Sequence, residues 1–184
     1  MDPLVLLRRV GFEKVDWTFD DLAHNRWLTP GIWRLRRSTE HGDEQLVLKW
    51  LSASRPVGNT AWEAHWSSLS DQPTRWNYWA REALAYQSGV PASVFGGMNG
   101  FVTPNCVGLD VTEIDAVMLF EFVDGLAAEH WSIDQYGEAA NALGVVQGRA
   151  TQCEEPWLSK GFLRDYSTEK PVDWGLLDSD AAWE

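Results

Sequence analysis

The chain has 184 residues, a formal net charge of −12, and 45% apolar against 23% charged residues. This composition is that of a globular protein, and the length suits one sizeable domain or two small lobes that share a cleft. The negative charge would repel nucleic-acid phosphates, which argues against a nucleic-acid partner. Apolar runs are far shorter than the roughly 20 residues that cross a bilayer, and the N-terminus does not have the pattern of a signal peptide. We therefore expect a cytoplasmic protein without a membrane partner.

The two cysteines bear on whether the chain has a zinc site or a disulfide. Neither Cys106 nor Cys153 has a second Cys or a spaced His nearby, which argues against a zinc site. Two buried free thiols are the favoured interpretation, and a disulfide is the alternative.

Five of the twelve tryptophans lie between residues 50 and 79. We interpret them as packing residues rather than as a stacking or sugar-binding surface.

The first predicted strands form a β-hairpin. Residues 33–37 alternate between apolar and polar side chains, residues 40–43 supply turn residues, and residues 46–51 are again typical of a strand. A turn signal at Thr29-Pro30-Gly31 predicts that another strand or short helix, around residues 17–27, precedes the hairpin.

A helix is expected after an irregular stretch. Residues 52–75 contain loop-like sequence on both sides of a short Trp-containing segment, and we interpret them as an insertion or a lid. Residues 75–87 then place apolar side chains on one face at spacings of four and three, which predicts a helix. Gly89 is positioned to end that helix as its C′ residue.

Two strands and a second helix follow. One strand is expected over residues 101–102 and 107–111, and the next over 116–123, whose continuous apolar run indicates burial on both faces. Ser132 and Gln135 have the spacing of a capping box. The helix that they begin has an apolar stripe made of Tyr136, Ala139, Ala140, Leu143 and Val146.

Lys49 lies among the apolar residues of the second hairpin strand and shares a face with Val47. Because an ammonium group is costly to bury without a partner, this face would suit a cleft that holds an anion. The alternative is a strand-end lysine that extends into solvent. Glu82, which lies between Trp79 and Tyr86 on the inward face of the predicted helix, is the carboxylate partner that a buried ammonium needs. Such a pair would orient Lys49 toward phosphate oxygens.

The end of the 116–123 strand is the third candidate element. Residues 120–125 run from an apolar strand into a turn. In a cleft between two lobes, the backbone C=O of Glu121 and the N–H of Val123 would be available to an adenine edge. The alternative is a buried strand that simply ends.

Taken in order, four segments of the chain resemble the aminoglycoside phosphotransferase and choline kinase superfamily. They are Val47-Leu48-Lys49, the Glu82 helix, residues 119–125 and the helix through residues 143–148, and the resemblance extends over about residues 25–150. It implies an α+β fold with a protein-kinase-like N-lobe, which has an antiparallel sheet of about five strands and one crossing helix. The N-lobe would be residues 1–123, with the insertion at 52–75, and residues 124–184 would begin a helical C-lobe.

The resemblance also implies a nucleotide site for ATP or GTP with Mg²⁺. Lys49 would contact the α- and β-phosphates with Glu82 as its ion-pair partner, and residues Glu121, Phe122 and Val123 would form the adenine-binding hinge. Val47 and Gly31 complete the set of expected nucleotide-binding residues.

The chain also departs from this family. Gly31 is the single glycine of the turn at 29–33, where these kinases have a richer phosphate loop, and Gln147 stands where the family helix commonly has a histidine. The triplet at 41–43, His-Gly-Asp, matches the catalytic triplet in letters only, because it lies in the hairpin turn. No catalytic-loop Asp, following Asn or Mg²⁺-binding Asp comes after the helix near residue 150. We therefore expect the catalytic and metal-binding residues beyond residue 184 of a longer protein.

The leading hypothesis is that the intact protein is an enzyme, a phosphotransferase that moves the γ-phosphoryl group of ATP or GTP to a hydroxyl of a small molecule. This chain alone would bind the nucleotide without catalysing the reaction. The alternative is a pseudokinase-like or free-standing lobe that acts as a protein-binding module, which predicts a homodimer or a tight partner.

Overall fold

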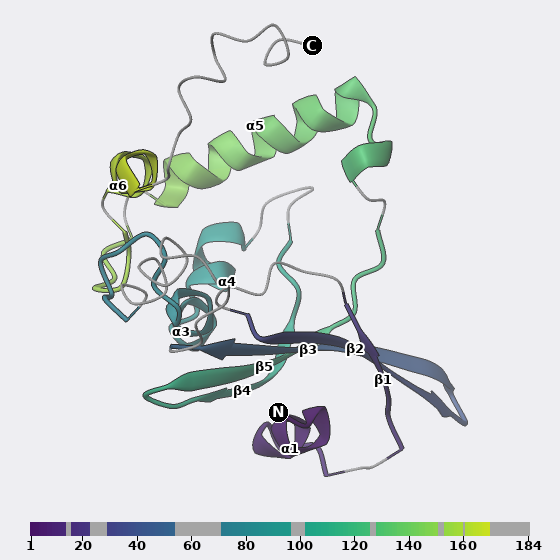
Figure 1. The fold of residues 1–184 in the computed structure, drawn as a ribbon. Helices are drawn as coiled ribbons and strands as arrows, with labels where there is room; N and C mark the ends of the chain where they lie inside the picture. Colours follow the sequence, from purple (N-terminus) through teal and green to yellow (C-terminus); the bar gives the residue numbers. More distant parts are fainter. Residues whose placement is uncertain are drawn as a thin grey trace, which may run out of the picture.

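The fold is a five-stranded antiparallel sheet with helices on both faces (Figure 1). The computed structural model describes residues 1–13, 16–22, 29–53, 71–96, 102–125, 128–150, 153–159 and 161–169. The strands are β1 (Thr18–Asp21), β2 (Gly31–Thr39), β3 (Gly42–Ser52), β4 (Cys106–Val111) and β5 (Asp115–Glu121), in the order β1-β2-β3-β5-β4. The helices are α1 (Pro3–Arg9), α3 (Arg81–Gln87), α4 (Val90–Phe95), the 3₁₀ turn η1 (Ala128–His130), α5 (Ile133–Ala150) and α6 (Phe162–Glu169). The expected α+β class and the antiparallel sheet of about five strands are confirmed.

The predicted hairpin is β2 and β3. Its turn is closed by the Thr39 hydroxyl, which donates to the carbonyl of Gly42 at 2.7 Å and accepts from the amide of His41 at 3.2 Å. Gly42 has a φ of +119°, which glycine adopts without steric cost. The strand expected before the hairpin is β1, which pairs with β2 from Thr18 to Asp21.

The two later strands are also present, with shorter bounds than expected. In β5, five consecutive residues from Ala116 to Phe120 are buried, as the continuous apolar run predicted. The strand ends at Glu121 rather than at residue 123. β4 begins at Cys106, and Val102 is an exposed residue outside any strand.

Alternating side chains of the sheet form two separate cores. The core on the α1 face contains Leu6, Leu7, Trp17, Leu35, Leu48, Val117 and Leu119. The core on the α3 face contains Leu51, Trp79, Ala80, Ala83, Ala116, Met118 and Phe120. Each large apolar side chain buried in this way contributes about 1.5–3 kcal/mol to folding. The two cores hold α1 and α3 on opposite faces of the same strands.

The N-terminal helix α1 was not among the predicted elements. It begins at a good N-cap, because the Asp2 carboxylate accepts from the amide of Leu4 at 2.9 Å and Pro3 occupies the first helical turn. Leu6 and Leu7 are completely buried against the sheet. The residues considered only as a candidate signal peptide therefore form one wall of the core.

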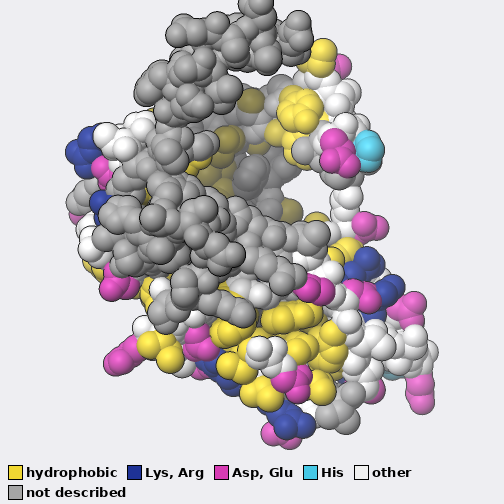
Figure 2. All heavy atoms as spheres, viewed as in Figure 1, with side chains coloured by type: hydrophobic (Ala, Val, Ile, Leu, Met, Phe, Trp, Pro, Cys, Tyr) yellow, Lys and Arg dark blue, Asp and Glu magenta, His cyan; other side chains and the backbone are white. Residues whose placement is uncertain are grey.

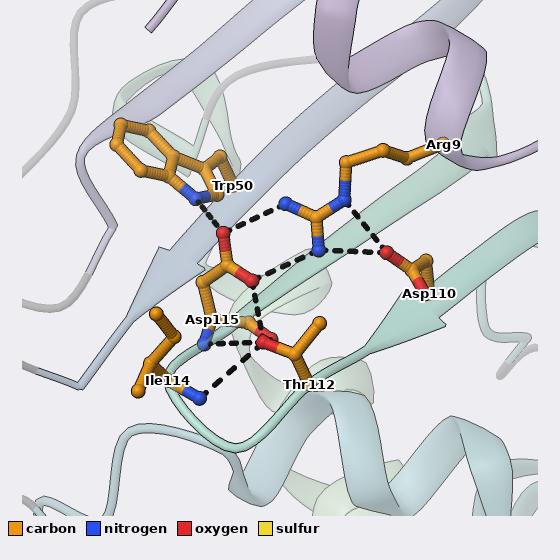
Figure 3. A network of polar contacts seen from close by, with 6 residues as sticks. All are labelled: Arg9, Trp50, Asp110, Thr112, Ile114 and Asp115. Atoms are coloured by element: carbon orange, nitrogen blue, oxygen red, sulfur yellow. Dashed lines mark hydrogen bonds and ion pairs between the residues drawn. The ribbon is translucent and has the colours of Figure 1, made fainter.

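A polar network joins the end of α1 to β4 and β5 (Figure 3). The guanidinium of Arg9 donates to both carboxylate oxygens of Asp115, at 2.7 and 2.9 Å, and to Asp110 at 2.7 Å. Asp115 also accepts from the Trp50 indole N–H at 3.1 Å and from the Thr112 hydroxyl at 2.7 Å. Two carboxylates on neighbouring strands thus share one cation.

Helix α3 begins at Arg81, six residues later than the predicted start at residue 75. The reason is that the carbonyl groups of Arg75 and Trp76 accept hydrogen bonds from the Arg81 side chain, while the preceding residues form separate turns. The predicted end is confirmed, because Gly89 follows the C-cap residue Ser88 and has a φ of +74°.

Helix α5 has the predicted capping box. The amide of Ser132 donates to the Gln135 side-chain oxygen at 2.8 Å, and the amide of Gln135 donates to the Ser132 hydroxyl at 3.3 Å. Most of the apolar stripe is nevertheless exposed: Tyr136 and Leu143 are about half exposed, and Val146 is buried. No helix in the described ranges is long and apolar enough to span a membrane.

Both cysteines are free thiols, as favoured by the sequence. The expectation that they are buried is only partly right, because both are half-buried. Of the five tryptophans at 50–79, Trp79 is buried and Trp50 packs against the core on the α1 face, which agrees with a packing role for these two. Most of the proposed insertion at 52–75, with two of its tryptophans, lies outside the described residues.

Candidate functional site

Lys49 and Glu82 meet between the sheet and α3. The Lys49 ammonium on β3 donates to a carboxylate oxygen of Glu82 on α3, in an ion pair between residues 33 positions apart. Their side chains are 21% and 42% exposed, so that the pair is accessible rather than sealed in the core. Ala83, the next residue of α3, is fully buried and seats the helix on the sheet. The ion pair predicted from the sequence is confirmed, and its role in binding a nucleotide stays a prediction.

An aromatic pair lies beside this ion pair. The rings of Tyr86 on α3 and Phe120 on β5 pack edge to face with their centroids 5.0 Å apart. Burial raises the pKa of the Tyr86 hydroxyl, and the negative charge of Glu82 raises it further. Burial also raises the pKa of the nearby Cys106 thiol. Both groups are therefore neutral near pH 7.

The chain that leaves β5 is held at its first two residues. The amide of Glu121 donates to the carbonyl of Asn105 at 3.0 Å, and the amide of Phe122 donates to the carbonyl of Gln45 at 3.4 Å. The guanidinium of Arg34 lies over the Phe122 ring, 4.2 Å from its centroid. Val123 is exposed. The segment expected to bind adenine is thus anchored to β3 up to Phe122 and accessible from Val123 onward.

Strand register relates this segment to the ion pair. Leu46 pairs with Glu121 and Lys49 pairs with Met118, so that three residues separate the two positions along the strands, or about 10 Å. Val47 lies between them and belongs to the core on the α3 face. The structure therefore places Val47, Lys49 and Glu82 on the same face of the sheet, next to the start of the 121–123 segment.

Gly31 is arranged differently from the other predicted site residues. It pairs with Trp50, and its Cα is covered by the indole of Trp33, which packs with the core on the α1 face. A Cβ at this position would lie 1.9 Å from the Trp33 ring. Packing against Trp33 accounts for this glycine, and the position that a side chain would occupy is on the face opposite Lys49.

A cavity of about 530 Å³ lies beside α3. Its described lining residues are Thr29, Leu51, Tyr78, Trp79, Arg81, Glu82, Ala85, Val90, Trp157 and Leu158. Of the predicted site residues only Glu82 belongs to this lining, so the cavity extends toward the N-terminal end of α3 rather than toward residues 121–123. Figure 2 shows the molecule hollowed between α5 and the sheet, with hydrophobic side chains in the hollow.

A protein site for a metal ion needs several ligand side chains that lie close together. Within the described residues there is no cluster of three or more His, Cys, Asp or Glu side chains suited to a metal ion. His41 lies in the β2–β3 turn as expected, whereas Asp43 is the second residue of β3, where its carboxylate accepts a hydrogen bond from the Ser38 hydroxyl at 2.8 Å. The role of Lys49 toward phosphate groups and the place of the Mg²⁺ ligands both stay predictions.

Sequence reasoning missed two cations of this region. Arg34 on β2 contacts Phe122, and Arg81 at the start of α3 lines the cavity. Strand alternation was a usable signal for Arg34, since it shares the pleat face of its cross-strand partner Val47. No local signal marks Arg81, whose partners are backbone carbonyls.

A scan against protein-family models and a search of curated proteins both find no match to this chain.

Proposed function

We propose that the chain binds ATP or GTP on the α3 face of the sheet, as the nucleotide-binding portion of a kinase-like small-molecule phosphotransferase. The observation that carries the proposal is the Lys49–Glu82 ion pair, which joins β3 to α3. In protein kinases, an ion pair between a strand lysine and a helix glutamate positions the lysine for the nucleotide phosphates. The cytoplasm would supply the nucleotide.

The surrounding residues support this assignment. The strand order β1-β2-β3-β5-β4 puts β5 next to β3, so that the chain leaving β5 begins about 10 Å along the strands from Lys49. A base on the 121–123 segment and phosphates at Lys49 would then lie along one face, over Val47. Lys49 would offset phosphate charge, and Glu82 would keep its ammonium oriented.

The catalytic step requires further groups. Bound Mg²⁺ would neutralise the phosphate charge that develops during transfer. An attacking hydroxyl of the small-molecule acceptor also needs a carboxylate to orient it, and we assign neither this group nor the metal ligands to the described residues. The role proposed for this chain is therefore to bind and orient the nucleotide.

Replacement of Lys49 by alanine tests the proposal. Calorimetric titration with Mg²⁺-ATP and Mg²⁺-GTP is expected to show saturable binding by the wild-type chain that weakens about 10- to 100-fold in Lys49→Ala, as for the loss of a hydrogen bond to a charged group. Arg8→Ala is the matched control, because it removes one exposed positive charge on the opposite face. Absence of binding by a folded wild-type chain, or equal affinity in Lys49→Ala, would contradict the proposal.

The exposed stripe of α5 favours a second function, that of a protein-binding module. Tyr136 and Leu143 are seven residues apart on one side of the helix and about half exposed. We propose a second copy of the chain as the partner, with two α5 stripes packed together. Light scattering is expected to give the mass of a dimer for the wild type and of a monomer for Leu143→Glu. Val145→Glu, an exposed position about 200° around the helix, should leave the dimer intact; a monomeric wild type would exclude this function.

A further inference from the structure

Arg81, the first residue of α3, connects two parts of the chain that are far apart in sequence. Its guanidinium donates to the carbonyl oxygens of Trp76 at 2.6 Å, Pro73 at 3.1 Å and Arg75, all of which precede the helix. Its Nε donates to the carbonyl of Trp157 at 3.0 Å, 76 positions later. Four backbone oxygens therefore surround one cation, and the planar guanidinium is the side chain suited to bind several acceptors in fixed directions.

The segment that contains Trp157 lies against this region. Trp157 is buried, and with Leu158 it lines the cavity beside α3. A second contact comes from α6, because the rings of Phe162 and Tyr166 lie 6.0 and 4.9 Å from the ring of Trp76. Residues 153–159 and α6 thus hold the turn from which α3 begins.

Helix α3 needs such an external anchor. It has seven residues, and its N-cap residue Ala80 forms no side-chain capping hydrogen bond. A helix this short is not stable by itself, so tertiary contacts must fix it. The cavity of about 530 Å³ lies between α3 and the Trp157 segment, which means that apolar packing does not fill this junction and the Arg81 hydrogen bonds bridge it.

We propose that Arg81 is a positioning residue through which residues 153–159 hold α3 in the place where Glu82 meets Lys49. Glu82 follows Arg81 directly in α3, so that a shift of the first helical turn moves its carboxylate away from the Lys49 ammonium. The segment that follows α5 thereby sets the geometry of the ion pair from outside the sheet. A lower nucleotide affinity on loss of Arg81 is a consequence that rests on the proposed function, whereas the effect on the ion pair does not.

Zero-length cross-linking with a carbodiimide tests the positioning role without a nucleotide. The reagent joins a carboxylate to an amine only where the two are in contact, and mass spectrometry of the digest gives the yield of the Lys49–Glu82 product. The yield is expected to fall about threefold or more in Arg81→Met and in Trp157→Ala, as for two residues coupled through one network. Arg81→Lys keeps the charge and one point of contact, and is expected to give an intermediate yield.

Three control variants separate positioning from general destabilisation. Glu82→Gln should abolish the product, and Arg164→Met, which removes an exposed arginine of α6, should leave it unchanged. Arg9→Met weakens the fold from the opposite face and should also retain the cross-link. A wild-type yield in folded Arg81→Met or Arg81→Lys would overturn the proposal, as would an equal loss in Arg9→Met.

Titration of the same variants with Mg²⁺-ATP distinguishes the two proposals. A cross-link that depends on Arg81 in a chain without nucleotide affinity would leave the positioning role standing and reject the nucleotide site. Nucleotide binding together with a cross-link that does not depend on Arg81 would support the nucleotide site and reject the positioning role of Arg81.

Discussion

Replacement of Arg9 by methionine is expected to lower the free energy of unfolding by about 2–3 kcal/mol, somewhat less than for a fully buried ion pair. The Asp115 carboxylate is only 13% exposed and relies on Arg9 for its cation. In Arg9→Met the carboxylate keeps the hydrogen bonds from Trp50 and Thr112 but has no compensating charge. Methionine retains most of the apolar stem, so that the loss comes mainly from the guanidinium. Urea unfolding of the wild type and of Arg9→Met measures this loss of free energy.

Arg8→Met is the matched control for this prediction. Arg8 precedes Arg9 in α1 and is exposed, so its replacement should change the free energy of unfolding by no more than about 0.5 kcal/mol. Equal losses in the two variants would mean that α1 responds to net charge rather than to the Asp115 contact.

The cost of Arg9→Met should also depend on pH. The hydrogen bonds from Arg9 lower the pKa of Asp115 from 3.8 to about 2, against the opposing effect of burial and with help from Thr112 and Trp50. A carboxyl group whose pKa is lowered by folding stabilises the fold above its unfolded pKa and loses this contribution as the pH falls through its folded pKa. The difference between wild type and Arg9→Met is therefore expected in full above about pH 4 and to shrink toward pH 2. A difference that stays constant over this range would show that Asp115 is not the partner that matters.

Those parts of the fold that depend on local patterns were predictable from sequence. The β2–β3 hairpin follows from strand alternation around a turn that contains Gly42, and β5 follows from a continuous apolar run. The capping box at Ser132 and Gln135 marks the start of α5, since both of its hydrogen bonds lie within one helical turn. In each case the residues that determine the element lie within it.

Two helices show where local patterns were insufficient. The signal for α1 was present, because Asp2 and Pro3 form an N-cap and first turn, but seven residues are too few for a clear apolar periodicity. The late start of α3 has a different cause. The Arg81 side chain takes up carbonyls that a longer helix would use, and one of its partners, Trp157, is 76 positions away.

The candidate site was predictable in its residue types and only partly in its geometry. A lysine in an apolar strand and an inward-facing carboxylate on the next helix need each other, and the structure joins Lys49 and Glu82. Gly31 was predicted from its place in a turn, but the Trp33 indole that explains it is fixed by packing in the core on the α1 face. The anchoring of Phe122 to Gln45 depends on strand register, which residue patterns in a single strand do not reveal.

Replacement of Leu119 by alanine is expected to have the largest effect on stability, a loss of about 3–5 kcal/mol in the free energy of unfolding. Leu119 is completely buried in the core on the α1 face, and it pairs with Leu48 of β3 on one side and with Gly108 of β4 on the other. Because the sheet cannot collapse around the missing atoms, most of the cavity should remain.

Ile114→Ala is the control, since Ile114 is 67% exposed in the turn between β4 and β5 and its truncation should cost less than about 1 kcal/mol. Urea unfolding compares the free energies of unfolding of the two variants. The carbodiimide cross-link between Lys49 and Glu82 should persist in folded Leu119→Ala, because that pair lies on the opposite face of the sheet. If Leu119→Ala lowered the free energy of unfolding by less than about 1 kcal/mol, α1 would not pack against the sheet as described. If the cross-link disappeared in folded Leu119→Ala, the two faces of the sheet would not respond independently.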